Sequence, residues 1–129
     1  MRLLSLSLRG AIGIERGLGV EDVSIDFTRF EPGIVALVAS NGRGKSTILE
    51  SLHPYRTLVS RSGSLASHFS LRDSHRILKF EMAGSEWESR ILLDGQNGKS
   101  EAYLYRDQQS LNDGKLTTYD AAVRDAFGS

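Results

Sequence analysis

The sequence contains no cysteine, and this absence excludes disulfides, thiolate zinc sites and thiol catalysis. It also has no net charge, because 16 Lys and Arg residues balance 16 Asp and Glu residues. A compact nucleic-acid-binding domain usually has a marked basic excess, since much of its affinity comes from neutralising phosphates. The composition therefore gives no support to DNA binding by this chain and leaves open only a local basic patch.

Long hydrophobic runs are missing as well. No apolar stretch approaches the roughly 20 residues that span a bilayer. The leucine-rich start, Met1 to Leu8, is interrupted by Ser5 and Ser7, and no small-residue cleavage site follows it. We therefore predict a cytoplasmic protein that does not contact a membrane.

The length of 129 residues suits one compact domain and is too short for two ordinary ones. The hydrophobic fraction of 40% and the charged fraction of 25% are close to those of soluble globular proteins, so disorder of the whole chain is not expected. We treat residues 1–129 as a single domain.

Alternating apolar residues predict two strands near the N-terminus. Leu4, Leu6 and Leu8 alternate with polar residues, and Val23 to Phe27 repeats the pattern. The four glycines between them, within Gly10 to Gly19, predict a loop. The two strands are close in sequence, so we expect them to pair antiparallel.

The next segment has a different pattern. Ile34 to Val38 is apolar without alternation, which is typical of a central strand covered on both faces of an α/β sheet. A glycine-containing loop follows. Ile48, Leu49 and Leu52 then lie on one stripe of a predicted helix, and Pro54 would end that helix at about His53.

The C-terminal half reads as a loop, a three-stranded meander and a helix. Ser60 to Ser74 is rich in serine and predicts the loop. Alternation predicts strands at Leu78–Met82, Trp87–Ile91 and Tyr103–Tyr105. In the last helix, Thr117 and Asp120 have the spacing of a capping box, and Gly128 is a natural C-terminal stop.

The sharpest motif lies between the predicted buried strand and its helix. It is a Walker A phosphate-binding loop with alanine, Ala39, at its first position, followed by Ser40, Asn41, Gly42, Arg43, Gly44, Lys45, Ser46 and Thr47. The glycines let successive backbone N–H groups point at phosphate oxygens, and the start of the helix adds its positive dipole end. We predict that Lys45 binds the β- and γ-phosphates of ATP, that Ser46 binds Mg²⁺, and that Thr47 contacts the α-phosphate. Lys45 would stabilise charge in the transition state.

Asn41 in front of the glycine-lysine run resembles ABC ATPases, and especially the heads of SMC, RecF and SbcC-type proteins. The order of a first strand, a loop, a second strand and a glycine turn into Walker A is also similar. The meander and the final helix, Asp120 to Gly128, resemble SbcC-type repair ATPases. The resemblance implies an α/β P-loop NTPase fold, the N-terminal lobe of an ABC ATPase head, with an antiparallel meander beside the Walker A strand and helix.

The same resemblance implies an ATPase that acts in DNA double-strand-break repair or chromosome maintenance. ATP and Mg²⁺ would bind Walker A of one head and be sandwiched by the signature motif of another head, closing a dimer. The implied partners are the C-terminal half of the same head, a head-to-head dimer partner, DNA and a nuclease subunit.

Two departures from the family matter. Relatives have an aromatic and a basic residue after the first strand that contact the nucleotide, whereas this chain has Gly10 to Gly13, leaving Arg9 and Arg16 as candidate substitutes. Ile91 to Asp94 resembles Walker B, but Gly95 replaces the catalytic glutamate, and a hairpin turn explains Asp94 better.

The glutamine loop, the signature motif, Walker B and the switch histidine would all follow Ser129. We therefore expect a fragment that binds ATP without hydrolysing it. The strand Ile34 to Val38 would then lack a neighbour, which predicts dimerisation, strand exchange or poor solubility.

Other chemistry-bearing residues have simpler interpretations. The histidines do not form a metal cluster and read as surface or helix-end residues; they are His53, His68 and His75. Three aromatic residues that could stack bases fit core or cross-strand packing better, namely Trp87, Tyr103 and Tyr105. Three arginines near the serine-rich loop read as solvated, namely Arg61, Arg72 and Arg76.

Two other functions stay open. A P-loop small-molecule or nucleotide kinase would also use this motif, although the antiparallel meander argues against the βαβ units of such kinases. The second is a non-catalytic module in which ATP only stabilises an interface. The sequence does not distinguish such a module from an ATPase.

Overall fold

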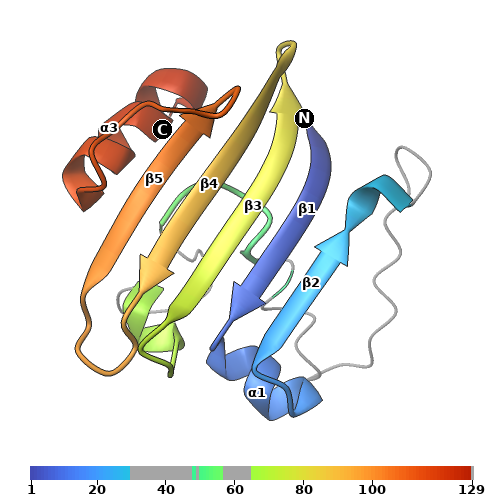
Figure 1. Cartoon of the computed structure of the whole chain (residues 1–129), viewed down its shortest axis with the longest axis vertical. Helices are drawn as coiled ribbons and strands as arrows, with labels where there is room; N and C mark the ends of the chain where they lie inside the picture. The colour runs from blue at the N-terminus through green and yellow to red at the C-terminus, as the bar shows by residue number, and fades with distance from the viewer. Residues whose placement is uncertain (30–47, 49, 57–64, 129) are drawn as a thin grey trace.

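The computed structural model describes residues 1–29, 48, 50–56 and 65–128. Within these residues the chain forms a six-stranded antiparallel sheet in the order β2-β1-β3-β4-β5-β6, accompanied by two α-helices (Figure 1). The elements are β1 (Arg2–Arg9), α1 (Ile12–Leu18), β2 (Asp22–Asp26), β3 (Ser74–Met82), β4 (Ser85–Leu93), β5 (Ser100–Arg106), β6 (Gln109–Ser110) and α3 (Leu116–Phe127), with short 3-10 helices η1 (Phe27–Arg29) and η2 (Leu65–His68).

The first two strands confirm the sequence prediction. β1 and β2 pair antiparallel with Leu6 opposite Ile25 and Leu8 opposite Val23, so their apolar side chains share one face. The predicted glycine loop between them is wrong, because it contains α1. The helix ends at Gly19, whose φ of 71° is left-handed, and it buries Ile14 completely. Burial of that isoleucine outweighs the low helix propensity of the glycines inside α1.

The predicted meander is confirmed by β3, β4 and β5, which pair antiparallel in sequence order. The β3–β4 turn places Ala83 and Gly84 at φ values of 53° and 79°, which matches the twist of a tight hairpin. Asp107 and Gln108 form the corresponding turn between β5 and β6, with φ values of 49° and 70°. These local turns bring neighbouring strands together without a crossover.

The expected α/β architecture, with a Walker A strand and helix beside the meander, is wrong. Every pair of neighbouring strands among the described residues is antiparallel. The described fold is mostly β and has two α-helices beside the sheet. A parallel pair needs a crossover of a dozen or more residues, which hairpins such as β3–β4 do not provide. The α/β prediction depended on Ile34 to Val38, which lies outside the described residues.

One face of the sheet carries the core. Alternate residues of β1, β3, β4 and β5 point to this inner face, and α3 packs on it through Tyr119 and Val123. The buried strand residues on this face include Leu6, Leu8, Leu78, Phe80, Trp87, Ile91, Ala102 and Leu104. The ring of Phe127, at the end of α3, meets the Trp87 ring edge-on at 4.7 Å between centroids. Aromatic pairs of this geometry add to the stability from buried area.

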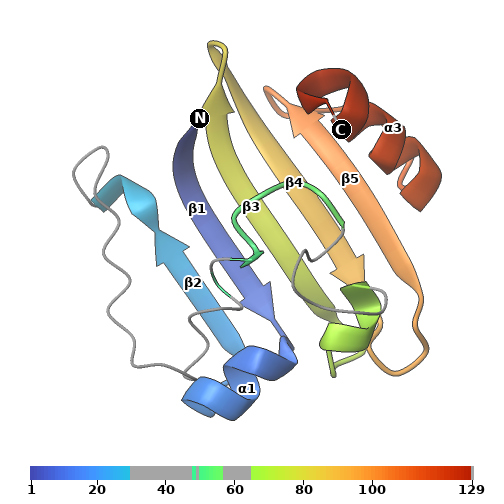
Figure 2. The ribbon, with the colours of Figure 1, turned by 180° about the vertical axis from the view of Figure 1, so that it is seen from behind.

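The segment that follows the Walker A motif also crosses the inner face. Figure 2 shows residues 50–56, in green, passing over β3 and β4. Ile48 and Glu50 are helical, and Ser51 lies in the turn that follows. The Ser51 N–H donates to the Ile48 carbonyl at 3.0 Å. The helical conformation therefore ends at Glu50, earlier than the predicted His53, because Pro54 restricts only the residue before it and sets a limit rather than an end point.

Helix α3 confirms the predicted C-terminal helix but corrects its cap. The N-cap is Lys115, which makes no side-chain cap, so the expected Thr117–Asp120 capping box is absent. Asp120 instead binds Arg56, a partner from a distant part of the chain. Gly128 ends the helix as predicted, and its N–H bonds the Arg124 carbonyl at 2.9 Å.

Candidate functional site

The Walker A motif itself, Ala39 to Thr47, lies outside the described residues, and so does the predicted strand before it. The structure does describe the chain that leaves the motif. Ile48 follows Thr47 directly and is only 6% exposed, within the hydrophobic core. Leu52, which shares the predicted helical stripe with Ile48, packs against the same core. The geometry of the site is therefore built from residues 48 and 50–56, hereafter the anchor segment, and from the residues that bind them.

Polar side chains of the sheet and α3 bind the end of the anchor segment. The Arg76 guanidinium of β3 donates from Nη2 to the Tyr55 carbonyl at 2.7 Å. Arg56 donates to both carboxylate oxygens of Asp120, at 2.8 and 2.5 Å, and so ties the segment to the first turns of α3. The Tyr55 hydroxyl donates to the Gly128 carbonyl at 2.9 Å, beyond the last turn of the same helix. The segment thus contacts α3 near both of its ends.

Tyr119 supplies a further contact to this segment. Its hydroxyl donates to the Pro54 carbonyl and lies 2.6 Å from the Ser89 hydroxyl. A carbonyl only accepts, so the single Tyr119 proton goes to Pro54, and Ser89 must donate to Tyr119. Burial raises the pKa of Tyr119 and keeps this proton in place. The result is a directed chain from Ser89 through Tyr119 to the Pro54 carbonyl, with the Ser89 and Tyr119 side chains fully buried.

Arg76 is the largest fully buried side chain of the described residues, although sequence reasoning placed it in a solvated loop. The alternation of β3 explains the difference, because Arg76, Leu78 and Phe80 share the inner face. Burial lowers the pKa of Arg76, and the nearby Tyr119 hydroxyl offsets part of this shift. An arginine nevertheless stays protonated in proteins, so β3 holds a positive charge under the anchor segment.

His53 lies in the anchor segment and was predicted at the surface or a helix end. It is partly buried, and its Nδ1 accepts the Tyr55 N–H at 3.1 Å, which places its ring proton on Nε2. Burial first, and the Arg76 charge second, hold the pKa of His53 below its usual value. The ring is therefore neutral near pH 7.

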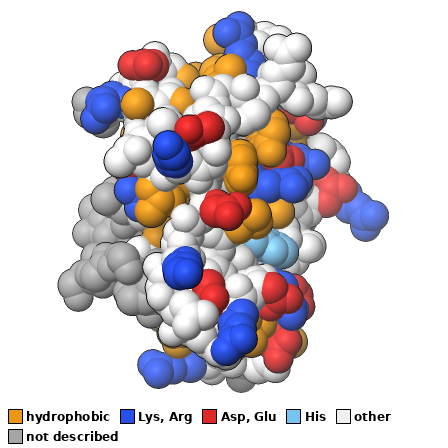
Figure 3. Space-filling view, turned by 60° about the vertical axis from the view of Figure 1, so that its left-hand side comes forward, with side chains coloured by type: hydrophobic (Ala, Val, Ile, Leu, Met, Phe, Trp, Pro, Cys, Tyr) orange, Lys and Arg blue, Asp and Glu red, His pale blue; other side chains and the backbone are white. Residues whose placement is uncertain are grey.

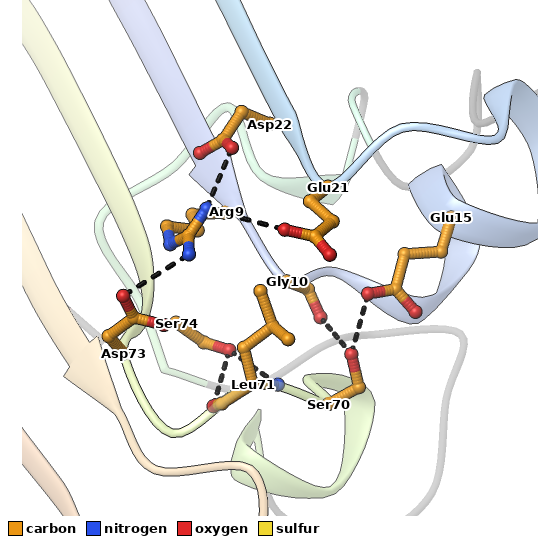
Figure 4. A network of polar contacts seen from close by, with 9 residues as sticks. All are labelled: Arg9, Gly10, Glu15, Glu21, Asp22, Ser70, Leu71, Asp73 and Ser74. Carbon is orange, nitrogen blue, oxygen red and sulfur yellow. Dashed lines mark hydrogen bonds and ion pairs between the residues drawn. The ribbon is translucent and has the colours of Figure 1, made fainter.

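A second polar network lies where β1 ends (Figure 4). The Arg9 guanidinium is 2.8 Å from the Asp22 carboxylate, 3.2 Å from Asp73 and 3.7 Å from Glu21. Hydrogen bonding to Asp73 is the largest cause that raises the pKa of Arg9. Three carboxylates around one arginine disfavour a phosphate there, which weakens the candidate nucleotide contact by Arg9. The other candidate, Arg16, is exposed in the last turn of α1.

Ser70 closes the same network on the side of α1. Its hydroxyl donates to Glu15 at 2.7 Å, and its N–H binds the Gly10 carbonyl at 2.8 Å. The Gly10 N–H in turn binds the Glu21 carbonyl at 2.8 Å. The network therefore fixes the path of the chain between β1 and α1 and reads as a structural feature.

The outer face of the sheet carries the two tyrosines considered for base stacking. The Tyr103 and Tyr105 rings lie 6.1 Å apart and nearly parallel, and the Arg90 guanidinium is 5.9 Å from the Tyr105 centroid. Glu88 forms ion pairs with both cations on this face of β3 and β4, at 3.0 Å from Arg90 and 3.6 Å from Lys79. Figure 3 shows acidic and basic side chains interspersed on the side of the molecule that is turned toward the viewer. This face lacks the excess of positive charge that nucleic-acid binding needs.

The remaining candidate residues have structural roles. Trp87 is in the core, as predicted, and Asp94 caps the β4–β5 turn by accepting the Gln96 and Asn97 N–H groups at 2.9 and 3.0 Å. That turn confirms the hairpin interpretation of Asp94 over a Walker B role. Arg72 binds Gln96 at 2.8 Å.

The other two histidines occupy separate places. His75 shares a 2.8 Å hydrogen bond with Ser7 across β1 and β3, and His68 ends η2. Within the described part of the chain, no group of three or more His, Asp or Glu side chains is placed to hold a metal ion. Arg61 lies outside the described residues.

Comparison of the sequence with protein-family models and with curated proteins finds no match. Among the helices that the structure describes, none combines the length and the apolar character needed to cross a bilayer.

Proposed function

We propose that this chain binds ATP with Mg²⁺ through the loop Ala39 to Thr47, as part of an SMC/SbcC-like ATPase in DNA double-strand-break repair or chromosome maintenance. The observation that carries the proposal is the Walker A sequence, in which Ala39 replaces the first glycine and every other defining residue is present. Two glycines free the backbone to face phosphate oxygens, Lys45 supplies the cation for the β- and γ-phosphates, and Ser46 supplies a hydroxyl ligand for Mg²⁺.

The anchor segment supports this proposal. A phosphate loop gains affinity only if its donors are held in place before the ligand arrives, because ordering them on binding would cost conformational entropy. The chain leaves the motif at Ile48, a core residue, and is bound again at Pro54, Tyr55 and Arg56. The exit from the motif is therefore attached to the sheet and to α3.

Hydrolysis is a separate proposal. In the class that the sequence resembles, a second head supplies the signature motif across the bound ATP, and a glutamate activates the attacking water. No recognisable form of either occurs in these 129 residues. We therefore expect ATPase activity only when a C-terminal half of the head and a second head are supplied.

The antiparallel meander disfavours the kinase alternative. Kinases that use this motif follow it with βαβ units, whereas β3, β4 and β5 are joined by hairpins. A non-catalytic ATP-dependent interaction module would share the same binding step, so binding is the property to test first.

The experiment is titration calorimetry of the chain with Mg-ATP, repeated with Lys45→Ala. Lys99→Ala serves as the matched control, because it removes an exposed lysine from the β4–β5 turn. We expect saturable binding by the wild type and by the control, and its loss in Lys45→Ala and in EDTA. Absence of binding by the wild type, or equal binding by Lys45→Ala, would contradict the proposal.

A further inference from the structure

His53 binds the backbone of the anchor segment, and we propose that it is a pH-sensitive switch, which keeps this segment on the sheet only while its ring is neutral. The switch involves described residues alone and does not depend on nucleotide binding. His53 is partly buried, and its Nδ1 accepts the Tyr55 N–H at 3.1 Å. Arg76 of β3 donates from Nη2 to the carbonyl of the same tyrosine at 2.7 Å. The histidine and the arginine therefore bind the two backbone groups of one residue.

Protonation of His53 removes its bond to Tyr55 directly. Nδ1 accepts a hydrogen bond only while it carries no proton, whereas both ring nitrogens of a protonated imidazole are donors. The Tyr55 N–H would then face a second N–H in place of an acceptor. This contact of the anchor segment is thus present in the neutral state of the ring and absent in the charged state.

The groups around His53 also disfavour a charged ring. Burial first, and the Arg76 charge second, lower the pKa of His53, while a backbone hydrogen bond with Glu50 and the Glu50 charge act in the opposite direction. On the side of α3, the Asp120 carboxylate is already paired with Arg56 by two hydrogen bonds. Within the part of the chain that the structure describes, the charge of another element that acts on His53 is that of Arg76, and it opposes protonation.

The closed state, with the anchor segment on the sheet, leaves two donors of Arg76 unused. Arg76 is 0% exposed, and its Nε and Nη1 find no hydrogen-bond partner among the described residues. Such donors favour an open state, because water would bind them once the segment moved away. Tyr119, whose pKa burial raises, stays neutral and keeps its bond to the Pro54 carbonyl as the solution is acidified. His53 is therefore the group whose titration changes the balance between the two states.

The direction of the pH effect follows from the proton count of the two states. In the closed state the pKa of His53 is below its ordinary value of 6.5, and in the open state the ring faces solvent and returns to that value. Opening therefore takes up a proton. The closed state is fully stabilised by this linkage above pH 6.5 and loses the stabilisation as the pH falls toward the lower pKa.

The test is hydrogen exchange of the nucleotide-free chain at about pH 7.5 and about pH 5.5, values chosen on either side of the ordinary histidine pKa. Each rate is corrected for the intrinsic effect of pH on exchange, and residues 50–56 are compared with β3 and β4. His53→Asn is the test variant, because the Asn side-chain oxygen can accept in place of Nδ1 and does not titrate. His75→Asn is the matched control, since His75 is also partly buried with a lowered pKa but bonds Ser7 of β1.

We expect the protection of residues 50–56 to fall about threefold more than that of β3 and β4 at the lower pH, both in the wild type and in His75→Asn. His53→Asn should remove this excess. A chemical-shift titration of the wild-type ring supplies a second measurement if His53→Asn does not fold. The His53 ring should titrate below pH 6.5, over the range in which residues 50–56 lose protection.

Three results would overturn the proposal. The first is an excess fall in protection that persists in His53→Asn, because another group would then cause it. The second is an equal fall over residues 50–56, β3 and β4, which would indicate loss of stability of the whole fold. The third is a His53 ring that titrates without any change in the exchange of residues 50–56.

Discussion

Replacement of Tyr119 by phenylalanine removes one oxygen from the interior and breaks the chain of hydrogen bonds from Ser89 to Pro54. The ring keeps its packing, so the change isolates the hydroxyl. Both partners lose their bond to Tyr119 in a region closed to solvent, because Ser89 is 0% exposed and Pro54 is buried. Two bonds at about 1 kcal/mol each, with the added cost of an unsatisfied buried acceptor, predict a loss of about 2 to 3 kcal/mol in the free energy of unfolding.

The assay is urea unfolding followed by the fluorescence of Trp87, the only tryptophan. Tyr103→Phe is the matched control, because among the described residues the Tyr103 hydroxyl makes a single hydrogen bond, an exposed one of 3.3 Å to Glu101. The control should stay within about 0.5 kcal/mol of the wild type. Ser89→Ala should cost less in the Tyr119→Phe background than alone, since the partner of Ser89 is then already gone.

The outcome that refutes this reasoning is specific. If Tyr119→Phe unfolds at the same urea concentration as Tyr103→Phe, the hydroxyl of Tyr119 does not hold the anchor segment. A strictly additive double variant would show that Ser89 and Tyr119 are not coupled, and the assigned chain of hydrogen bonds from Ser89 to Pro54 would then be wrong.

Two further predictions concern backbone geometry and pH. Gly10→Ala should lower the free energy of unfolding by about 3 kcal/mol, because φ at Gly10 is 76° and an added Cβ would lie 2.2 Å from Ser74 Oγ. Gly98→Ala, at a similar φ of 71° but with no atom near the added Cβ, should lower it by only about 1 kcal/mol. Equal losses for the two variants in urea unfolding would rule out the clash at Gly10. Burial lowers the pKa values of His53 and His75 below 6.5, so the folded state binds fewer protons than the unfolded chain. The free energy of unfolding should therefore fall as pH drops from about 7 through 6.5 toward the folded pKa values, and His53→Gln with His75→Gln should flatten that slope, whereas an unchanged slope would contradict it.

Much of the local structure could be predicted from the sequence. The period-2 alternation at Leu4 to Leu8 and at Leu78 to Met82 depends only on which side of a strand each residue faces, so both strands were predicted. The helix that ends at Gly128 follows from a similar local period. The Walker A motif is equally local, because its chemistry resides in consecutive residues, and it stays a prediction from sequence.

The fold class could not be predicted from the sequence. Whether strands lie parallel or antiparallel depends on how the chain connects them, and the apolar run Ile34 to Val38 favoured an α/β sheet that the described strands do not form. The helix α1 was missed because its glycines suggested a loop, while its stability comes from burying Ile14 against distant residues.

For the candidate site, too, some residues follow from the sequence and others only from the structure. The sequence alone predicts the phosphate-binding residues, Ser40 to Thr47, because a triphosphate would contact a short continuous stretch of backbone. Only the tertiary structure decided that Arg76 is buried, that Tyr119 bonds Pro54 and that Asp120 pairs with Arg56. Each of these contacts joins residues far apart in the chain. Their free energy depends on exclusion of water by the folded core, and no local pattern of residues records it.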